Sequence, residues 1–145
     1  AVEWRARSIA ILPGARLRGL VADLSSIPDA AMTLCVLCCI AEGESRLTGL
    51  GNLVHKECDR LSALECELRK LGADIRAEAD GFSIRGRPVR ELHGARIETY
   101  KDHRMAMCLS LPGTRVQGVE ILDPACVEKT YPGYWRDLES WLGLR

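Results

Sequence analysis

Between Pro28 and Gly43 the sequence is nearly all apolar and contains the run AAMTLCVLCCIA. Proline suits the first turn of a helix, where its missing N–H costs nothing, and glycine commonly ends a helix. We therefore predict a helix that begins at Pro28 and runs to Gly43. Because this helix has hardly any polar face, it has to be buried on most of its sides.

Strand patterns precede and follow this helix. Before it we predict two strands, separated by the turn signal Pro13-Gly14, at Val2–Ile11 and Leu17–Leu24. After it we predict a strand at Arg46–Leu50, the turn Gly51-Asn52 and a second helix at about Lys56–Leu71. A hairpin of two strands, Ala73–Ala77 and Phe82–Arg85, follows. The second helix carries one apolar stripe, formed by Leu61, Leu64, Leu68 and Leu71.

The same order of elements then begins again. A strand, a helix, a strand and a helix are predicted at Arg96–Thr99, Asp102–Leu111, Val119–Leu122 and Pro132–Leu142. We interpret residues 1–145 as a single partial domain of class α/β (α+β) with repeated βαβαββ units, at about 17–86 and, incomplete, at about 95–145. The second unit has no predicted closing hairpin, so we expect an open sheet edge unless the N-terminal strand fills it. Such an edge either favours self-association or leaves residues 96–122 loosely ordered.

Charge and hydropathy argue against several classes of function. The 145 residues include 20 Lys and Arg and 20 Asp and Glu, whereas nucleic-acid and anionic-membrane binders rely on a cationic excess. No segment approaches the roughly 20 apolar residues of a spanning helix, and charges interrupt the opening residues where a signal peptide is apolar. We therefore predict a cytoplasmic protein with no nucleic-acid partner and no membrane partner.

Seven cysteines leave another interpretation open. Their odd number and their spread through predicted helices do not suit a disulfide framework, so a reducing compartment is favoured. Cys35 and Cys38 form a C-x-x-C motif with Cys39 beside it, which is compatible with zinc or redox chemistry. That run is apolar and lacks a second ligand pair, so we interpret these cysteines as buried small residues and predict no metal and no cofactor.

Four short segments concentrate charged residues where a loop meets a helix, which is where function is usually placed on a scaffold. The segments are IPDAAMT, NLVHKECDR, TYKDHRMAM and DPACVEKTYPGYW, with the charged or titratable residues Asp29, Lys56, Glu57, Arg60, Asp102, His103, Arg104 and Lys129. Each segment also has an ordinary explanation: a helix-start charge, surface salt bridges, a capping Asp with a structural His, and a solvated lysine. If the cations converge, they form a site for a multiply charged anion, with two carboxylates available for proton transfer.

Four longer segments carry a resemblance to a known family. They are IPDAAMTLCVLCCIAEG, GNLVHKECDRLSALECELRKLGADI, ETYKDHRMAMCLSL and ILDPACVEKTYPGYWRDL. In order and spacing they resemble the C-terminal part of the 5-enolpyruvylshikimate-3-phosphate (EPSP) synthases, also called 3-phosphoshikimate 1-carboxyvinyltransferases, from about Leu17 to Leu142. Members of that family have six βαβαββ units in two domains, so the resemblance implies part of the C-terminal domain of the enolpyruvyl transferase fold.

The resemblance also implies an activity and roles for single residues. The family moves the carboxyvinyl group of phosphoenolpyruvate to the 5-hydroxyl of shikimate 3-phosphate and releases phosphate, on the way to chorismate and aromatic amino acids. Asp29 matches the base for that hydroxyl, and Glu57 matches the proton donor to the methylene carbon. The remaining matches are Asn52 and Lys56 for shikimate 3-phosphate, Arg60, Arg104 and Lys129 for phosphoenolpyruvate, and His103 beside them.

The resemblance includes two departures and leaves three competing hypotheses open. Many family members have arginine where this sequence has Val54, and Pro112-Gly113 should shorten the helix that contains DHRMAM. Much of the family's length has no counterpart in this chain, so we expect the isolated chain to be inactive, and the first competing hypothesis is a non-catalytic anion-binding module. The second is the sister UDP-N-acetylglucosamine enolpyruvyl transferase, and the third is a zinc or redox protein.

Overall fold

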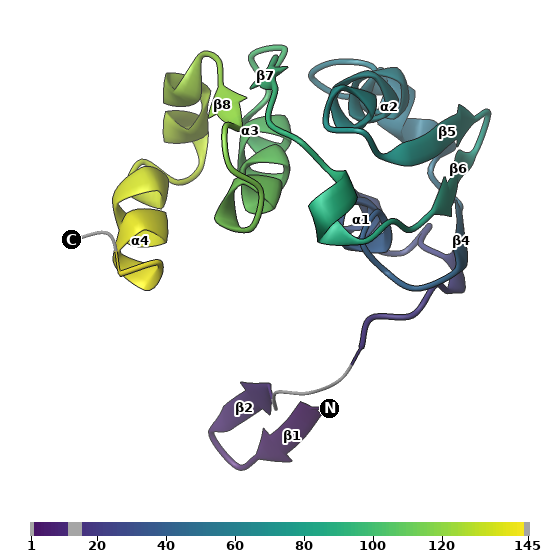
Figure 1. Cartoon of the computed structure of the whole chain (residues 1–145), viewed down its shortest axis with the longest axis horizontal. Coiled ribbons are helices and arrows are strands. Elements are labelled where there is room, and N and C mark those ends of the chain that lie inside the picture. Colours follow the sequence, from purple (N-terminus) through teal and green to yellow (C-terminus); the bar gives the residue numbers. More distant parts are fainter. Residues whose placement is uncertain (1, 12–15, 144–145) are drawn as a thin grey trace.

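A computed structural model describes residues 2–11 and 16–143 and shows a mixture of helices and strands (Figure 1), which confirms the predicted α/β class. The first half contains β3 Val21–Asp23, α1 Pro28–Cys38, β4 Glu44–Thr48, α2 Arg60–Lys70, β5 Asp74–Glu78 and β6 Gly81–Arg85. Their sheet has the strand order β3-β4-β6-β5. In it β3 and β4 are parallel, and β6 runs antiparallel to both β4 and β5.

This sheet has one buried face and one polar face, because side chains alternate along each strand. The inward side chains, at most 2% exposed, are Leu47, Ile75, Phe82 and Ile84. The opposite face carries the exposed Arg46, Arg76 and Arg85. Helix α1 packs against β4 and β6, and α2 packs against β5. The helices therefore cover the apolar face and leave the polar face open.

Helix α1 is buried on two sides. It packs against the sheet on one side and against α3 (His103–Ser110) on another. Ala31, Met32 and Cys35 are at most 1% exposed, so the predicted burial is confirmed. The helix ends at Cys38, earlier than predicted, because the next residues turn the chain back into β4, and Gly43 has the positive φ of 93° that such a turn uses.

Helix α2 begins at Arg60, not near Lys56 as predicted. The Asp59 carboxylate accepts a hydrogen bond from the Ser62 N–H at 3.1 Å and caps the helix, and a short 3-10 helix, η1 (Gly51–His55), precedes it. Lys56 and Glu57 therefore lie before the helix and not in its first turn. The predicted apolar stripe is confirmed by four side chains that are at most 3% exposed: Leu61, Leu64, Leu68 and Leu71.

The second half has a much smaller sheet. Its elements are β7 Arg96–Ile97, α3, the 3-10 helix η3 Leu111–Thr114, β8 Glu120–Ile121, the 3-10 helix η4 Pro124–Lys129 and α4 Tyr134–Trp141. The parallel strands β7 and β8 are shorter than predicted, because left-handed backbone follows both, at Tyr100 and Lys101 and at Asp123. Helix α3 stops at Ser110, ahead of Pro112, which confirms the predicted shortening.

The N-terminal segment is a hairpin and not the single strand predicted for Val2–Ile11. Strands β1 (Val2–Arg5) and β2 (Ser8–Ile11) pair antiparallel through a turn at residues 6 and 7. That turn contains no Gly, Asn or Asp, the usual hairpin signals, so the sequence pattern misses it. The hairpin stands apart from the rest of the molecule (Figure 1), and the predicted turn Pro13-Gly14 lies outside the described residues.

The cysteines of the C-x-x-C run are buried, as interpreted from the sequence. Cys35, Cys38 and Cys39 are at most 2% exposed, and burial is the main cause that raises the pKa of Cys39 to about 12. Within residues 2–11 and 16–143 no group of three or more His, Cys, Asp or Glu is placed to hold a metal ion. Over the same ranges no helix is both long enough and apolar enough to cross a membrane.

Candidate functional site

The charged segments noted in the sequence meet at one place, between the N-termini of α1, α2 and α3. Asp29 lies in the first turn of α1, Arg60 is the first residue of α2, and Arg104 lies in the first turn of α3. The connection before α2 contributes Lys56 and Glu57, and the last residue of η4 is Lys129. Ion pairs join these six side chains into one network.

Arg60 is the centre of this network. Its side chain is only 1% exposed. Nη1 donates to Asp29 Oδ1 at 2.9 Å, and Nη2 donates to Glu57 Oε2 at 2.7 Å. Nε and Nη2 also donate to the two carboxylate oxygens of Asp102, at 2.8 and 3.2 Å. A buried guanidinium needs such partners, because a charge removed from water is costly unless it is paired.

The charges around Arg60 keep it protonated. Burial acts to lower its pKa, but the hydrogen bonds to Asp102 and the negative charges of its carboxylate partners outweigh burial and raise it. Arg60 is therefore a permanent cation whose charge is shared among three carboxylates.

Three more cations lie at the solvent side of the network. Lys129 Nζ donates to Glu57 Oε1 at 2.9 Å. Arg104 Nη2 lies 3.2 Å from Asp29 Oδ2, and Lys56 Nζ lies 3.9 Å from Asp29 Oδ1. The side chains of Arg104 and Lys129 are 40% and 60% exposed, so both can reach a ligand from solvent. The cluster thus has four cations and three carboxylates, which favours an anionic ligand.

Glu57 is ionised in this arrangement. The hydrogen bond from Lys129 is the main cause that lowers its pKa from 4.5 to about 2; a hydrogen bond to its own backbone N–H and the charge of Arg60 act in the same direction. Both of its oxygens face cations, Oε1 towards Lys129 and Oε2 towards Arg60. Glu57 can take up a proton and pass it on only after those cations bind another anion.

The structure does not join two of the predicted site residues to the network. Asn52 lies exposed in η1 and, among the described residues, forms no hydrogen bond with the cluster. His103 is 3% exposed, and its Nδ1 lies 3.9 Å from Asp102 Oδ1 without a hydrogen-bond partner among the described residues. Val54, one of the two departures from the family pattern noted in the sequence, packs against the hydrophobic core.

Sequence reasoning named Asp102 but did not predict its contact with Arg60. We predicted only a capping Asp, and it does accept a hydrogen bond from the Arg104 N–H at 2.8 Å. It is also completely buried and binds Arg60, which is 42 residues away in the chain. The local signal for a cap explains the residue type fully, so the sequence holds no separate signal for the second contact.

The cluster combines cations of the kind that bind phosphate or carboxylate groups with carboxylates of the kind that transfer protons, on an α/β scaffold. The family model of EPSP synthase (3-phosphoshikimate 1-carboxyvinyltransferase) matches residues 1–138. The chain therefore belongs to the EPSP synthase family.

Individual relatives agree with this assignment. The chain is 42% identical to the 3-phosphoshikimate 1-carboxyvinyltransferase of Clostridium perfringens (strain ATCC 13124) over 99% of its own length and 33% of that protein. It is 46% identical to the enzyme of that name from Mannheimia haemolytica over 86% of its length and 29% of that protein. A solved EPSP synthase from Acinetobacter baumannii matches with a TM-score of 0.78 and 29% identity, over 88% of this chain and 30% of that one. The chain thus spans about a third of these relatives.

Proposed function

We propose that this chain supplies the phosphoenolpyruvate-binding part of an EPSP synthase active site. In that reaction the carboxyvinyl group of phosphoenolpyruvate moves to the 5-hydroxyl of shikimate 3-phosphate, and phosphate leaves. The observation that carries the proposal is the convergence of Arg60, Arg104 and Lys129 on the two carboxylates Asp29 and Glu57. Three cations match the combined charge of a phosphate and a carboxylate group on one small substrate.

The cations that bind the substrate differ in solvent exposure, so they contact it in a definite order. Arg104 and Lys129 are exposed enough to meet phosphoenolpyruvate first, whereas Arg60 is reached only past Asp29 and Glu57. An arriving anion competes with these two carboxylates for the same N–H groups. Binding therefore replaces ion pairs inside the protein by ion pairs to the substrate.

The same replacement prepares the two carboxylates for proton transfer. Once Lys129 and Arg60 hold the substrate, the two contacts that lower the pKa of Glu57 are weakened, and its pKa rises. Glu57 then takes up a proton from solvent and gives it to the methylene carbon of phosphoenolpyruvate. The 5-hydroxyl oxygen bonds to the central carbon and passes its proton to Asp29. Loss of phosphate and of one proton from the new methyl group restores the vinyl group. Asn52 and Lys56 contact shikimate 3-phosphate, and His103 lies beside the site.

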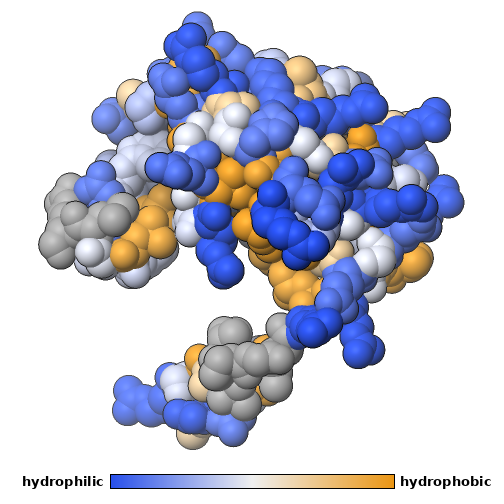
Figure 2. Space-filling model, in the orientation of Figure 1, coloured by the Kyte–Doolittle hydropathy of each residue, from blue (hydrophilic) through white to orange (hydrophobic). Residues whose placement is uncertain are grey.

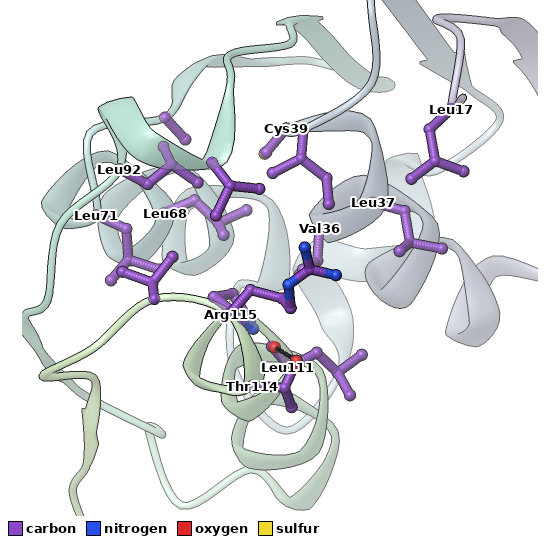
Figure 3. Close-up of a pocket in the computed structure, with 15 residues that line it drawn as sticks. Leu17, Val36, Leu37, Cys39, Leu68, Leu71, Leu92, Leu111, Thr114 and Arg115 are labelled. Atoms are coloured by element: carbon purple, nitrogen blue, oxygen red, sulfur yellow. Dashed lines mark hydrogen bonds between the residues drawn. The ribbon is translucent and has the colours of Figure 1, made fainter. Parts of the chain in front are cut away.

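The rest of the substrate-binding cleft has to come from polypeptide that this chain does not contain, because the chain spans about a third of its relatives. The chain has an apolar cavity of about 380 Å³ that is suited to contact that polypeptide (Figure 3). Leucines of α1, α2 and the segment after residue 89 surround the cavity, together with Leu17, Leu111 and Arg115. Figure 2 shows apolar side chains gathered in the middle of the molecule's face. We propose that the remaining EPSP synthase polypeptide covers this cavity.

The amino-acid composition supports a cytoplasmic location for the complete enzyme. All seven cysteines lie within the described residues and are free. Free thiols in that number suit a reducing compartment.

A reconstitution experiment tests the proposed function. The 145-residue chain is mixed with the part of the Clostridium perfringens relative that it does not match, and phosphate release from shikimate 3-phosphate and phosphoenolpyruvate is measured. We expect turnover from the mixture and none from either part alone. Glu57→Gln should lower the rate about 100-fold or more, whereas Glu65→Gln, which changes a carboxylate paired with Arg69 on α2, should not.

Four other results of the reconstitution experiment would contradict the proposed function. A folded mixture without activity rejects the assigned reaction, and activity only with UDP-N-acetylglucosamine reassigns the chain to the sister transferase. Turnover by the 145-residue chain alone rejects the need for further polypeptide. Binding of phosphate or phosphoenolpyruvate without turnover by the mixture supports the non-catalytic module instead.

A further inference from the structure

We infer that Asp102 is a positioning residue of this site, one that holds the Arg60 guanidinium so that its outer edge faces the bound anion. The inference rests on the proposed function, because the anion in question is phosphoenolpyruvate. It gives Asp102 a role beyond capping α3.

The contacts of Asp102 fix the plane of the guanidinium. Oδ2 accepts from Arg60 Nε at 2.8 Å, and Oδ1 accepts from Nη2 at 3.2 Å, a two-pronged arrangement along one edge of the group. Such paired hydrogen bonds restrict both rotation and tilt. The opposite edge, with Nη1 and the second N–H of Nη2, points to Asp29 and Glu57.

Exposure separates Asp102 from the other two carboxylates. The side chains of Asp29 and Glu57 are 38% and 31% exposed, so they can move aside when an anion arrives. Asp102 is 0% exposed and has no path to water. It therefore remains bound to Arg60 in the empty and the occupied site, while its neighbours exchange places with the ligand.

Asp102 also links Arg60 to the second ligand arginine. Oδ1 accepts the Arg104 N–H at 2.8 Å, which sets the start of α3, and the Arg104 side chain then extends to Asp29. The Cys58 thiol lies 3.7 Å from Oδ2 as a donor. Burial, followed by the charge of Asp102, raises the pKa of Cys58 to about 11, so that thiol stays neutral and adds no competing charge. One buried carboxylate thus orients both arginines.

Asp102→Asn separates positioning from capping. Asparagine caps a helix as well as aspartate does, and its carbonyl oxygen can take the place of Oδ1 at the Arg104 N–H. Its amide NH₂ then faces the Nε–H of Arg60, donor against donor. Asp102→Ser is the second variant, since serine also caps but reaches neither nitrogen of Arg60. The matched control is Glu67→Gln, because Glu67 is also 0% exposed, lies within α2, and accepts hydrogen bonds from Lys70 and the Glu98 N–H and none from Arg60.

The first measurement uses the 145-residue chain alone and follows the side-chain Nε–H signal of Arg60 by NMR. We expect this hydrogen to exchange at least about tenfold faster in Asp102→Asn and Asp102→Ser than in the wild type, and at the wild-type rate in Glu67→Gln. Backbone signals of α3 that stay in place show that the cap is intact. An unchanged Arg60 signal in both Asp102 variants would overturn the inference.

The second measurement uses the reconstituted enzyme. Loss of a buried, charge-assisted hydrogen bond should raise KM for phosphoenolpyruvate about 10- to 100-fold and leave KM for shikimate 3-phosphate unchanged. An equal rise in both KM values indicates a purely structural role and rejects positioning. If the wild-type mixture is inactive, the proposed function fails, while the NMR measurement still decides whether Asp102 holds Arg60.

Discussion

Both halves of the molecule contain two parallel strands joined through a helix, but they differ in what completes the sheet. In the first half, β3, α1 and β4 are followed by the hairpin β5–β6, which extends the sheet to four strands. In the second half, β7, α3 and β8 form a sheet of two strands with two residues each. So small a sheet contributes little stability by itself, so the second half depends on its contacts with the first.

Buried charges provide part of those contacts. Arg60 of α2 binds Asp102 at the start of α3, and Glu67 of α2 accepts hydrogen bonds from the Glu98 N–H at 3.0 Å and the Tyr100 hydroxyl at 2.8 Å. The N-terminus of α1 joins the same network through Asp29. The ion pairs of the candidate site therefore also connect the half with the four-stranded sheet to the half with the two-stranded sheet.

Removing Arg60 should break this connection most strongly. Arg60→Ala leaves Asp102 buried without its cation, which typically costs about 3–5 kcal/mol of unfolding free energy. Arg69→Ala is the control, since it removes an exposed pair with Glu65 on the same helix and should cost about 0.5 kcal/mol or less. Urea unfolding measures both, and equal effects of the two variants would contradict the connecting role of Arg60.

The capping residues of α2 and α3 should differ in how much they stabilise the fold. Asp59 and Asp102 cap α2 and α3 in the same way, but only Asp102 is buried against an arginine. Asp59→Ala should cost about 1 kcal/mol, the usual value of a cap. Asp102→Ala should cost about 3 kcal/mol or more, because it also leaves Arg60 without its buried partner. Thermal unfolding of both variants checks the difference, and a ratio near one would show that Asp102 acts only as a cap.

Hydrogen exchange tests the dependence of the second half directly. In a dilute, monomeric sample we expect amides of residues 96–122 to exchange at least about tenfold faster than those of α1 and α2. If protection of residues 96–122 rises with protein concentration, a second copy covers the open sheet edge, as predicted from the sequence. Uniform strong protection at all concentrations would show that the second half is stable by itself.

Acid should weaken the site by a smaller amount. Because the pKa of Glu57 is about 2 in the folded chain and 4.5 ordinarily, its ion pairs stabilise the fold fully above about pH 4.5 and progressively less as the pH falls towards 2. The urea midpoint of the wild type should therefore fall more between about pH 6 and about pH 3 than that of Glu57→Gln. Equal falls would show that Glu57 is not the titrating group.

Much of the fold and most of the candidate site follow from local sequence pattern. The apolar run after Pro28, the leucine stripe of α2 and the stop before Pro112 each depend on neighbouring residues, and the structure has all three. The grouping of Asp29, Glu57 and the four cations at helix starts also came from local features, namely charges where a loop meets a helix. The spacing of apolar residues and the capping of a helix involve residues within one or two helical turns, so a short segment of sequence is enough to predict them.

Only the tertiary structure decided which of these groups touch. The partners of Arg60 lie 31 and 42 residues away at Asp29 and Asp102, and Lys129 lies 72 residues from Glu57. These contacts between distant residues bury Asp102 and keep Glu57 ionised. The residues next to Asp102 and Glu57 in the chain do not indicate either property. Charge interactions depend on separation in space and on exclusion of water, and both arise only when the helices pack.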